Sequence, residues 1–112
     1  MVKSYIPARG DIVWLNFDPQ VGHEHSGHRP ALVLSPSEYN ERIGLMLCSP
    51  MTTQVKGYPF EVLVDGNPKK GAILADQIKS LDWREREAEK KGNVTKGTLA
   101  EVVDKIKTMM ED

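Results

Sequence analysis

The chain has 112 residues, with 15 lysines and arginines against 16 aspartates and glutamates and a formal net charge of -1. This length is enough for one hydrophobic core and too short for two ordinary domains, so a single domain over residues 1–112 is expected. The near-neutral charge argues against a protein that grips long nucleic acids through a basic surface, and any nucleic-acid contact must come from a local cluster.

The cysteine content and the apolar runs favour a cytoplasmic protein. The single cysteine, Cys48, excludes an intramolecular disulfide and indicates a reducing compartment. Cys48 lies in the apolar run 43–48, so a buried and inert thiol is expected. The sequence has no apolar run near the roughly 20 residues of a membrane span and no basic-then-apolar leader, which predicts no membrane partner.

Short apolar segments between glycine- and proline-rich turns predict strands. Residues 11–17 come first, and because both of their faces are mostly apolar we expect a central strand with Trp14 in the core. The other expected strands are 31–34, 43–49, 60–64 and 71–78. Pro50 is expected to end the third strand, and a single helical turn is expected at 38–40. Such strands in so short a chain predict a mainly β fold, a small closed or nearly closed barrel.

The last third of the chain changes to helical spacing. Asp82 and Glu85 have the spacing of a helix N-cap and its partner, which predicts a short charged helix that ends at Gly92. Its basic and acidic residues nearly balance, as on a solvated helix face. Thr98 and Glu101 repeat the capping pattern before a C-terminal amphipathic helix, which must pack on the barrel or on a partner. Its apolar stripe consists of Leu99, Val102, Val103, Ile106, Met109 and Met110.

A polar loop precedes the second expected strand. Between Gly22 and Pro30 it holds His23, Glu24, His25, His28 and Arg29. Three imidazoles and a carboxylate can be drawn as a zinc site, but the spacing matches no compact zinc signature and Cys48 is not placed as a fourth ligand, so no metal is expected. A solvated turn is the plain alternative.

The same loop can also supply the groups that cut RNA without a metal. That reaction needs a base, an acid and a cationic donor for the phosphorane. Glu24 and an imidazole suit proton transfer, whereas Arg29, which stays charged, suits phosphate binding. Thr52 and Thr53 can form a second wall of such a site, because hydroxyls and free amides at a strand end bind phosphate.

Other candidate RNA contacts lie outside this loop. Lys56 and Lys79 each border a loop or strand end that can line the same groove as Arg29. Tyr58 stands between glycine and proline, so we expect it to be exposed and able to stack on a base. Trp83, at the expected helix start, can pack against the core or against a partner.

Four segments, taken in order, resemble a known family. They are Gly10-Asp11-Ile-Val-Trp14, Gly22-x-Glu24-x-x-Gly27-His28-Arg29-Pro30-Ala-Leu-Val-Leu-Ser35, Thr52-Thr53-Gln54-x-Lys56-Gly57-Tyr58-Pro59-Phe60-Glu61-Val62 and Leu74-Ala75-Asp76-Gln77-Ile78-Lys79-Ser80. With them, practically the whole chain resembles the MazF/PemK/ChpB family of toxin endoribonucleases from type II toxin–antitoxin systems, and the MazF type in particular.

This resemblance implies an SH3-like β-barrel with appended helices, a homodimer and no cofactor. It implies sequence-specific, metal-independent cleavage of single-stranded RNA, namely mRNA, that leaves 2′,3′-cyclic phosphate and 5′-hydroxyl ends and stops translation and growth. The implied partners are the RNA and an antitoxin whose tail lies across the RNA groove, with no DNA.

The resemblance also assigns residues. The family's catalytic positions fall on Arg29 and Thr52, with Glu24 and His28 for proton transfer. The expected RNA-binding residues are Gln54, Lys56, Tyr58, Gln77 and Lys79. His23 and His25 depart from the family's pattern and take no role from it. Two alternatives stay open: a non-catalytic toxin of this fold that binds its target, as a gyrase poison does, and a barrel that binds RNA or an antitoxin without cutting.

Overall fold

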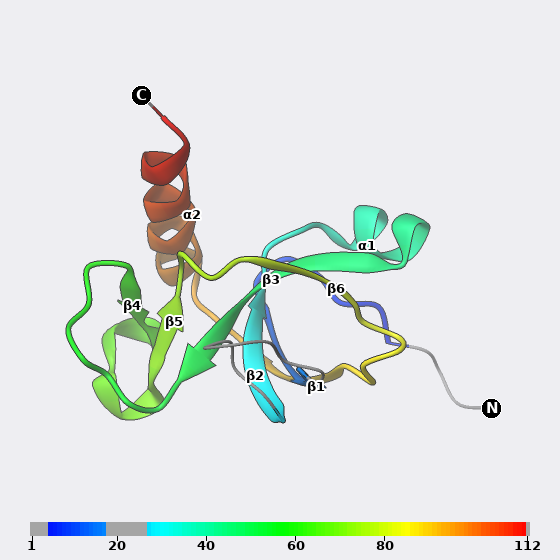
Figure 1. The fold of residues 1–112 in the computed structure, drawn as a ribbon, viewed down its shortest axis with the longest axis horizontal. Coiled ribbons are helices and arrows are strands. Elements are labelled where there is room, and N and C mark those ends of the chain that lie inside the picture. Colours follow the sequence, from blue (N-terminus) through cyan, green and yellow to red (C-terminus); the bar gives the residue numbers. More distant parts are fainter. Residues whose placement is uncertain (1–4, 18–26, 112) are drawn as a thin grey trace.

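The computed structural model describes residues 5–17 and 27–111. In these residues seven strands form one antiparallel, curved sheet, and α1 and α2 lie at opposite ends of the molecule (Figure 1). The elements are β1 (Asp11–Asn16), β2 (His28–Val33), α1 (Ser37–Ile43), β3 (Leu45–Thr52), β4 (Glu61–Leu63), η1 (Val64–Gly66), η2 (Pro68–Lys70), β5 (Ala72–Leu74), β6 (Lys79–Asp82), β7 (Glu89–Asn93) and α2 (Lys96–Met110).

β3 is the strand at which the sheet branches, because two different strands pair with different parts of one of its edges. The strand order is β4-β5-β3-β2-β1-β7, and β6 also pairs with β3. On one edge, β3 pairs with β6 over residues 45–48 and with β5 over residues 51–52. Pro50 was expected to end this strand, but it lies inside β3, opposite Ala31 of β2. Pro50 falls between the segments paired with β6 and β5, where a residue without an N–H is tolerated.

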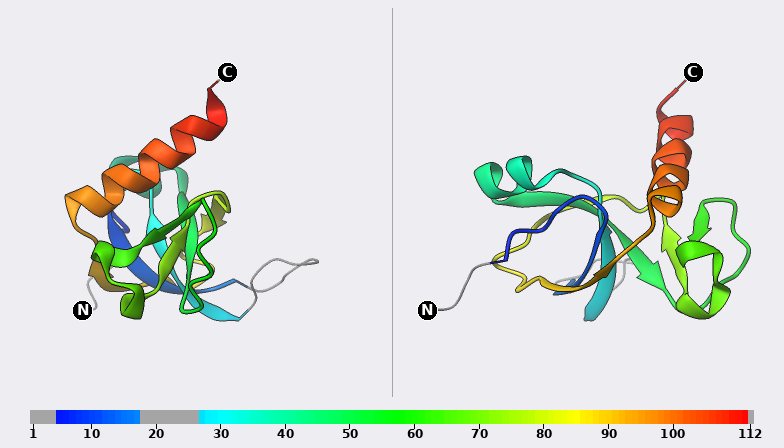
Figure 2. Two further views of the ribbon diagram at one scale, coloured as in Figure 1. Left: turned by 90° about the vertical axis from the view of Figure 1, so that its left-hand side faces the viewer. Right: turned by 180° about the vertical axis from the view of Figure 1, so that it is seen from behind.

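Two hydrophobic cores lie against this sheet. The alternation of β2 supplies both, since Ala31 and Val33 face the first core and Leu32 faces the second. The first core lies within the curved β1–β2–β3 part of the sheet. The second lies between the β4–β5 pair and α2, whose Val102 is fully buried. The expectation of a mainly β fold with a C-terminal helix is confirmed, and the left view of Figure 2 shows α2 lying across one end of the sheet.

The predicted charged helix from Asp82 to Gly92 is wrong. The local cap does form, because Asp82 Oδ1 accepts hydrogen bonds from Arg84 N at 3.1 Å and Glu85 N at 2.9 Å. The turn ends after a few residues, where Glu87 has a φ of +53°. The chain then enters β7, which pairs with the free side of β1. Tertiary pairing therefore overrides the helix-start signal.

Both true helices differ in detail from the predictions. α1 is a seven-residue helix, Ser37–Ile43, where one turn was expected. α2 is capped by Thr95, whose hydroxyl accepts a hydrogen bond from Thr98 N at 3.2 Å, so the prediction of Thr98 as the cap is wrong. The Thr98 hydroxyl instead donates to Asp65 Oδ1 at 3.2 Å, which ties α2 to η1.

The two tryptophans occupy different environments. Trp14 was predicted in the core, but it is 38% exposed and its ring stacks on His28, with centroids 6.1 Å apart. Trp83 is buried, and its indole nitrogen donates to the Asn40 carbonyl oxygen at 2.9 Å. β1 explains the first difference, since Val13 and Leu15 point into the first core and Trp14 lies on the other face of the strand, where it is exposed.

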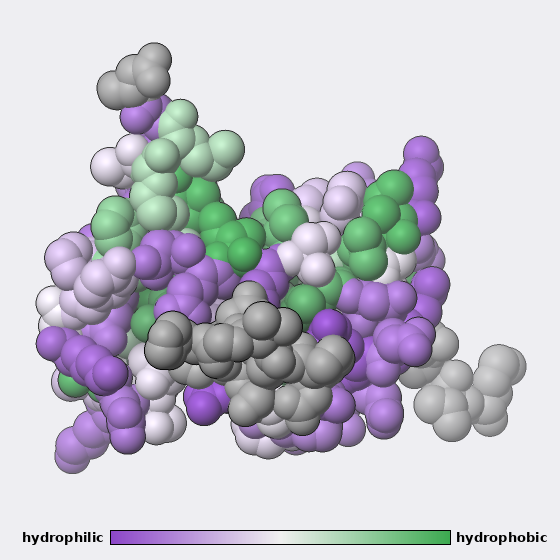
Figure 3. All heavy atoms as spheres, in the orientation of Figure 1, coloured by the Kyte–Doolittle hydropathy of each residue, from purple (hydrophilic) through white to green (hydrophobic). Residues whose placement is uncertain are grey.

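An apolar groove runs beside α2. It has a volume of about 780 Å³ and lies between the helix and the β3–β6 part of the sheet. Apolar side chains gather along α2 and beside it in Figure 3. The apolar residues of the groove are Leu34, Leu47, Ile78, Leu99, Ala100, Val103, Ile106 and Met110. Met110 is 81% exposed, so the end of the predicted stripe extends beyond the core of this chain. Within residues 5–17 and 27–111, no helix is long and apolar enough to cross a membrane.

Candidate active site

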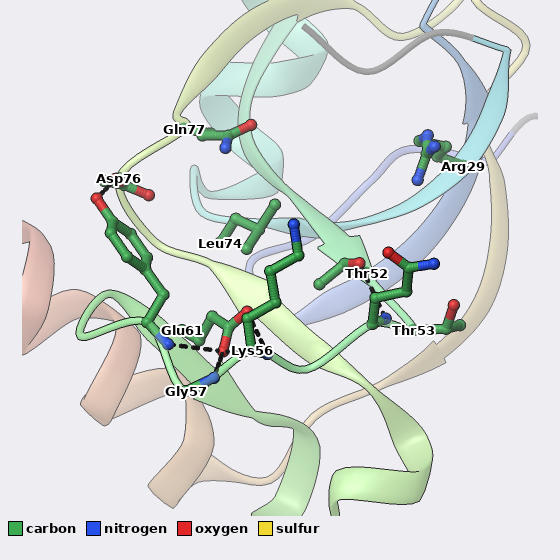
Figure 4. Close-up of a pocket in the computed structure, with 11 residues that line it drawn as sticks. Arg29, Thr52, Thr53, Lys56, Gly57, Glu61, Leu74, Asp76 and Gln77 are labelled. Atoms are coloured by element: carbon green, nitrogen blue, oxygen red, sulfur yellow. Dashed lines mark hydrogen bonds between the residues drawn. The ribbon is translucent and has the colours of Figure 1, made fainter. Parts of the chain in front are cut away.

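A polar cavity of about 740 Å³ opens where β2 begins and β3 ends (Figure 4). The 53–60 loop and the connection from β5 to β6 form its other walls. Its lining residues are Arg29, Thr52, Thr53, Gln54, Lys56, Gly57, Tyr58, Glu61, Leu74, Asp76 and Gln77. Six of the residues predicted from the sequence are therefore brought to one cavity: Arg29, Thr52, Gln54, Lys56, Tyr58 and Gln77.

Strand register explains why Arg29 and Thr52 line the same cavity. β2 and β3 pair Val33 with Cys48 and Ala31 with Pro50. Continuing this antiparallel pairing two positions further brings Arg29 opposite Thr52, and residues directly opposite on two strands point to the same face. A guanidinium fork and a hydroxyl on one face can together hold the oxygens of a single phosphate.

The backbone around Thr52 is fixed by close packing. The Thr52 hydroxyl accepts a hydrogen bond from Gln54 N at 3.1 Å, so its own proton can be donated to a ligand. Gly71 precedes β5 with a φ of +94°, and a Cβ there would lie 2.4 Å from the Thr52 carbonyl oxygen. Only glycine allows β5 to pass this close to Thr52.

Tyr58 and Asp76 form the opposite end of the cavity. The Tyr58 hydroxyl donates to Asp76 Oδ2 at 2.6 Å, and Figure 4 shows Asp76 at the far side of the cavity from Arg29. This hydrogen bond raises the pKa of Tyr58, so the phenol stays protonated at neutral pH. Tyr58 is 47% exposed, as predicted, which leaves its ring accessible. A phenol ring beside Gln77 and Lys56 offers stacking, hydrogen bonding and positive charge to a nucleotide.

Two acidic residues of the cavity were given no role by sequence reasoning. Glu61 accepts hydrogen bonds from the backbone of the 53–60 loop, and Asp76 accepts one from Tyr58. Both lie in segments that carry the family resemblance, and this position in the sequence could have marked them as candidate cavity residues. Their carboxylates offset the charges of Arg29 and Lys56, so the cavity is polar but not strongly basic.

Several predicted residues are not gathered at this cavity. His28 is next to Arg29 in β2, so it faces the other side of the sheet, where it contacts Trp14. Lys79 begins β6 opposite Cys48 and is not among the lining residues. Glu24, His23 and His25 lie outside the described residues. The roles of His28, Lys79 and Glu24 therefore stay predictions.

The described part of the chain holds no group of three or more His, Cys, Asp or Glu side chains placed to bind a metal ion. The predicted burial of Cys48 is confirmed. Burial raises the pKa of this thiol to about 12, which makes it a poor ligand and a poor nucleophile at neutral pH.

Comparisons with known proteins agree with this geometry. The sequence profile of the family described as PemK-like, MazF-like toxin of type II toxin–antitoxin system matches residues 8–110. The endoribonuclease toxin MazF of Escherichia coli (strain K12) is 51% identical over 110 residues, which cover 98% of this chain and 99% of that protein. The endoribonuclease toxin ChpB of the same strain is 32% identical over 117 residues, covering 99% of this chain and all of that protein, 100%.

Solved structures show the same similarity. A crystal structure of MazF from Deinococcus radiodurans superposes with a TM-score of 0.88 at 49% identity, covering 96% of this chain and 98% of that one. A MazE–MazF crystal structure from the same organism gives a TM-score of 0.81 at 48% identity, covering 95% of this chain and 97% of that one. By profile, sequence identity and fold, the chain belongs to the family of PemK-like, MazF-like toxins of type II toxin–antitoxin systems.

Proposed function

We propose that this chain is the endoribonuclease toxin of a type II toxin–antitoxin pair and that it cuts single-stranded mRNA without a metal ion. The observation that carries the proposal is that Arg29 and Thr52 line the same polar cavity. The family and the endoribonuclease names of its curated relatives support it.

In the proposed mechanism the 2′-hydroxyl of the RNA attacks the neighbouring phosphorus. The bond to the 5′-oxygen breaks, leaving a 2′,3′-cyclic phosphate and a 5′-hydroxyl. Arg29 holds two phosphate oxygens and stabilises the charge of the phosphorane, while Thr52 donates its hydroxyl proton to one of them. The resemblance assigns proton transfer to Glu24 and His28. Because the His28 ring stacks on Trp14, on the face of β2 opposite to Arg29, it would have to turn toward the cavity to take part in this step.

The remaining cavity residues are proposed to bind the nucleotides that flank the cut. Lys56 supplies a mobile positive charge, Gln54 and Gln77 supply amide donors and acceptors, and Tyr58 supplies a ring for stacking. Lys79, one strand away, is proposed to contact the RNA as it leaves the cavity. Because the cavity holds few cations, a short recognised sequence is expected instead of a long electrostatic contact.

The proposed setting is a cytoplasmic, single-domain homodimer of residues 1–112 inhibited by an antitoxin. Solved relatives include MazE–MazF complexes, so we propose a MazE-like partner whose tail covers the same cavity. The exposed apolar groove beside α2 is the proposed dimer surface, since Leu47, Ile78 and Met110 are all exposed there.

The test is cleavage of a synthetic single-stranded RNA of mixed sequence in excess chelator, with both product ends mapped. The wild-type chain is expected to leave cyclic phosphate and 5′-hydroxyl ends, and Arg29→Ala is expected to lose at least about 100-fold in kcat/KM. Arg42→Ala, an exposed arginine of α1, is the matched control and should cut normally.

Two results would contradict this proposal. Folded wild-type protein that binds RNA but leaves it intact would favour the non-cutting barrel. Cleavage that appears only after a divalent metal is added would return attention to the histidines of the 22–30 loop.

A further inference from the structure

Glu61 presents a physical problem if the cavity binds RNA. It is the first residue of β4, it is half-buried, and it lines the same cavity as Arg29 and Lys56. A carboxylate there repels phosphate unless its charge is engaged by nearby donors. The hydrogen bonds of Glu61 show how it is engaged.

Three consecutive backbone amides surround the Glu61 carboxylate. Oε1 accepts from Lys56 N at 3.1 Å, Gly57 N at 2.8 Å and Tyr58 N at 3.1 Å, and Oε2 lies 3.2 Å from Lys56 N. Gly57 has a φ of +80°, which lets the loop curl round the oxygen (Figure 4). Successive amides arranged in this way form an anion-binding nest, and here the anion is part of the chain.

The 53–60 loop has little else to hold it. Every residue from 53 to 59 is exposed, so burial in the core does not fix the loop. Outside the nest, two side-chain contacts tie the loop: the Tyr58–Asp76 hydrogen bond and Lys105 Nζ, which donates to the Pro59 carbonyl oxygen at 2.7 Å. Three further hydrogen bonds hold the two ends of the loop: Gln54 N to the Thr52 hydroxyl, Glu61 N to the Tyr58 carbonyl oxygen and Ala75 N to the Phe60 carbonyl oxygen. The Glu61 carboxylate thus makes four of the contacts that set the path of the backbone between Lys56 and Tyr58.

We propose that Glu61 is a positioning residue for RNA binding: it holds the 53–60 loop closed round its carboxylate and so directs the Lys56 side chain over the cavity. This inference rests on the proposed function of the cavity. Arg29 and Thr52 belong to β2 and β3, which the nest does not support. Loss of Glu61 should therefore weaken binding of RNA and leave the chemical step nearly intact.

The experiment measures kcat and KM separately for wild type, Glu61→Ala and Glu61→Gln on the RNA cut by the wild type. Glu61→Ala is expected to raise KM about tenfold with kcat within about twofold, and Glu61→Gln, which keeps one acceptor but no charge, is expected to fall between. Glu41→Ala, an exposed glutamate of α1, is the matched control and should behave as wild type.

A double-mutant cycle shows whether Glu61 acts through Lys56. In a Lys56→Ala background, Glu61→Ala should add little further loss, because the side chain it positions is gone. Amide hydrogen exchange of residues 56–58 should be faster in Glu61→Ala than in wild type, while exchange in β1–β3 stays unchanged.

Three results would overturn the inference while leaving the proposed function intact: an unchanged KM, a loss confined to kcat, or the full effect of Glu61→Ala in the Lys56→Ala background. Failure of the wild type to cut any RNA would refute the proposed function instead. In that case the double-mutant cycle of Glu61→Ala and Lys56→Ala is measured with the dissociation constant for RNA instead of KM. An unchanged rate of amide hydrogen exchange at residues 56–58 in Glu61→Ala would then refute the role of Glu61.

Discussion

The Thr52 hydroxyl is oriented before a ligand arrives. Because its oxygen already accepts from Gln54 N, its proton is the part left for a phosphate oxygen. Thr52→Val keeps the shape of the side chain and removes this donor, so kcat should fall about 100-fold, whereas Thr52→Ser should retain most of the activity. Steady-state cleavage rates measure this.

Thr108→Val provides the control for that substitution, since Thr108 is exposed on α2 and its hydroxyl bonds only within the helix. If Thr52→Val cuts as fast as wild type, the hydroxyl has no part in the reaction.

Because of Cys48, we expect the chain to become less stable as the pH rises into the alkaline range. Burial raises the pKa of Cys48 from 9.0 to about 12, so the folded state keeps the proton that the unfolded chain loses. The contribution of this thiol is complete below pH 9 and is lost as pH rises from 9 to 12, by at most about 1.4 kcal/mol per pH unit.

Urea unfolding at pH 8 and pH 10 measures this effect. Wild type should lose more of its free energy of unfolding between these pH values than Cys48→Ala, which has no thiol to ionise. Equal losses in the two proteins would mean that the thiol ionises as easily in the folded chain.

Sequence reasoning reached part of the cavity and missed the rest for a physical reason. Arg29 and Thr52 were found because their side-chain chemistry suits phosphate whatever the loop shape. Glu61 was missed because its role depends on the curl of a loop that no residue pattern specifies. His28 was predicted at the site because it is next to Arg29 in the sequence. Adjacent residues of a strand point to opposite faces, so this adjacency places His28 away from Arg29.

At the scale of single elements, the start of β5 packs against the backbone of Thr52 and so affects the position of this cavity residue. Gly71 and Gly66 both have positive φ, but a Cβ at Gly66 meets nothing within 4 Å, whereas one at Gly71 would strike the Thr52 carbonyl oxygen. Gly66→Ala should therefore cost only the backbone strain, about 1–2 kcal/mol. Gly71→Ala should cost more and should also lower kcat, because Thr52 must move.

Thermal unfolding and cleavage rates of these two variants separate strain from displacement. Equal losses of stability and unchanged kcat in both would show that the close approach of Gly71 to Thr52 has no effect on the site.

Strand positions were predictable from apolar alternation, but the identity of the 82–92 segment was not. Its cap forms as the local sequence predicts, and a few residues later pairing with β1 decides the structure. Pro50 gives the same lesson, since a proline signals a strand end only where the next strand requires its N–H. In both cases the deciding partner is distant in the sequence.

At the scale of the whole molecule, the groove beside α2 leaves apolar surface exposed on a single chain. Leu47, 39% exposed on β3, lies in this groove. Leu47→Asp should convert the proposed dimer into a folded monomer, because a carboxylate buried between two copies has no partner there. Sedimentation velocity measures the oligomeric state, and circular dichroism checks the fold.

Ile43→Asp is the control, since Ile43 is 51% exposed on α1 and lies outside the groove. A Leu47→Asp protein that sediments as a dimer would move the dimer surface elsewhere.

The segment 82–92, predicted as a helix, contains the edge strand β7, and its charges bear on solubility. The segment that reads as a charged helix face is β7, which ends the sheet beyond β1. Its exposed side chains include Glu89, Lys90 and Lys91, with Lys90 Nζ 3.5 Å from Asp11 Oδ1. An open strand edge is a template for pairing with another chain, and lysines along it oppose such stacking. We therefore expect these charges to oppose edge-to-edge pairing between copies of this chain.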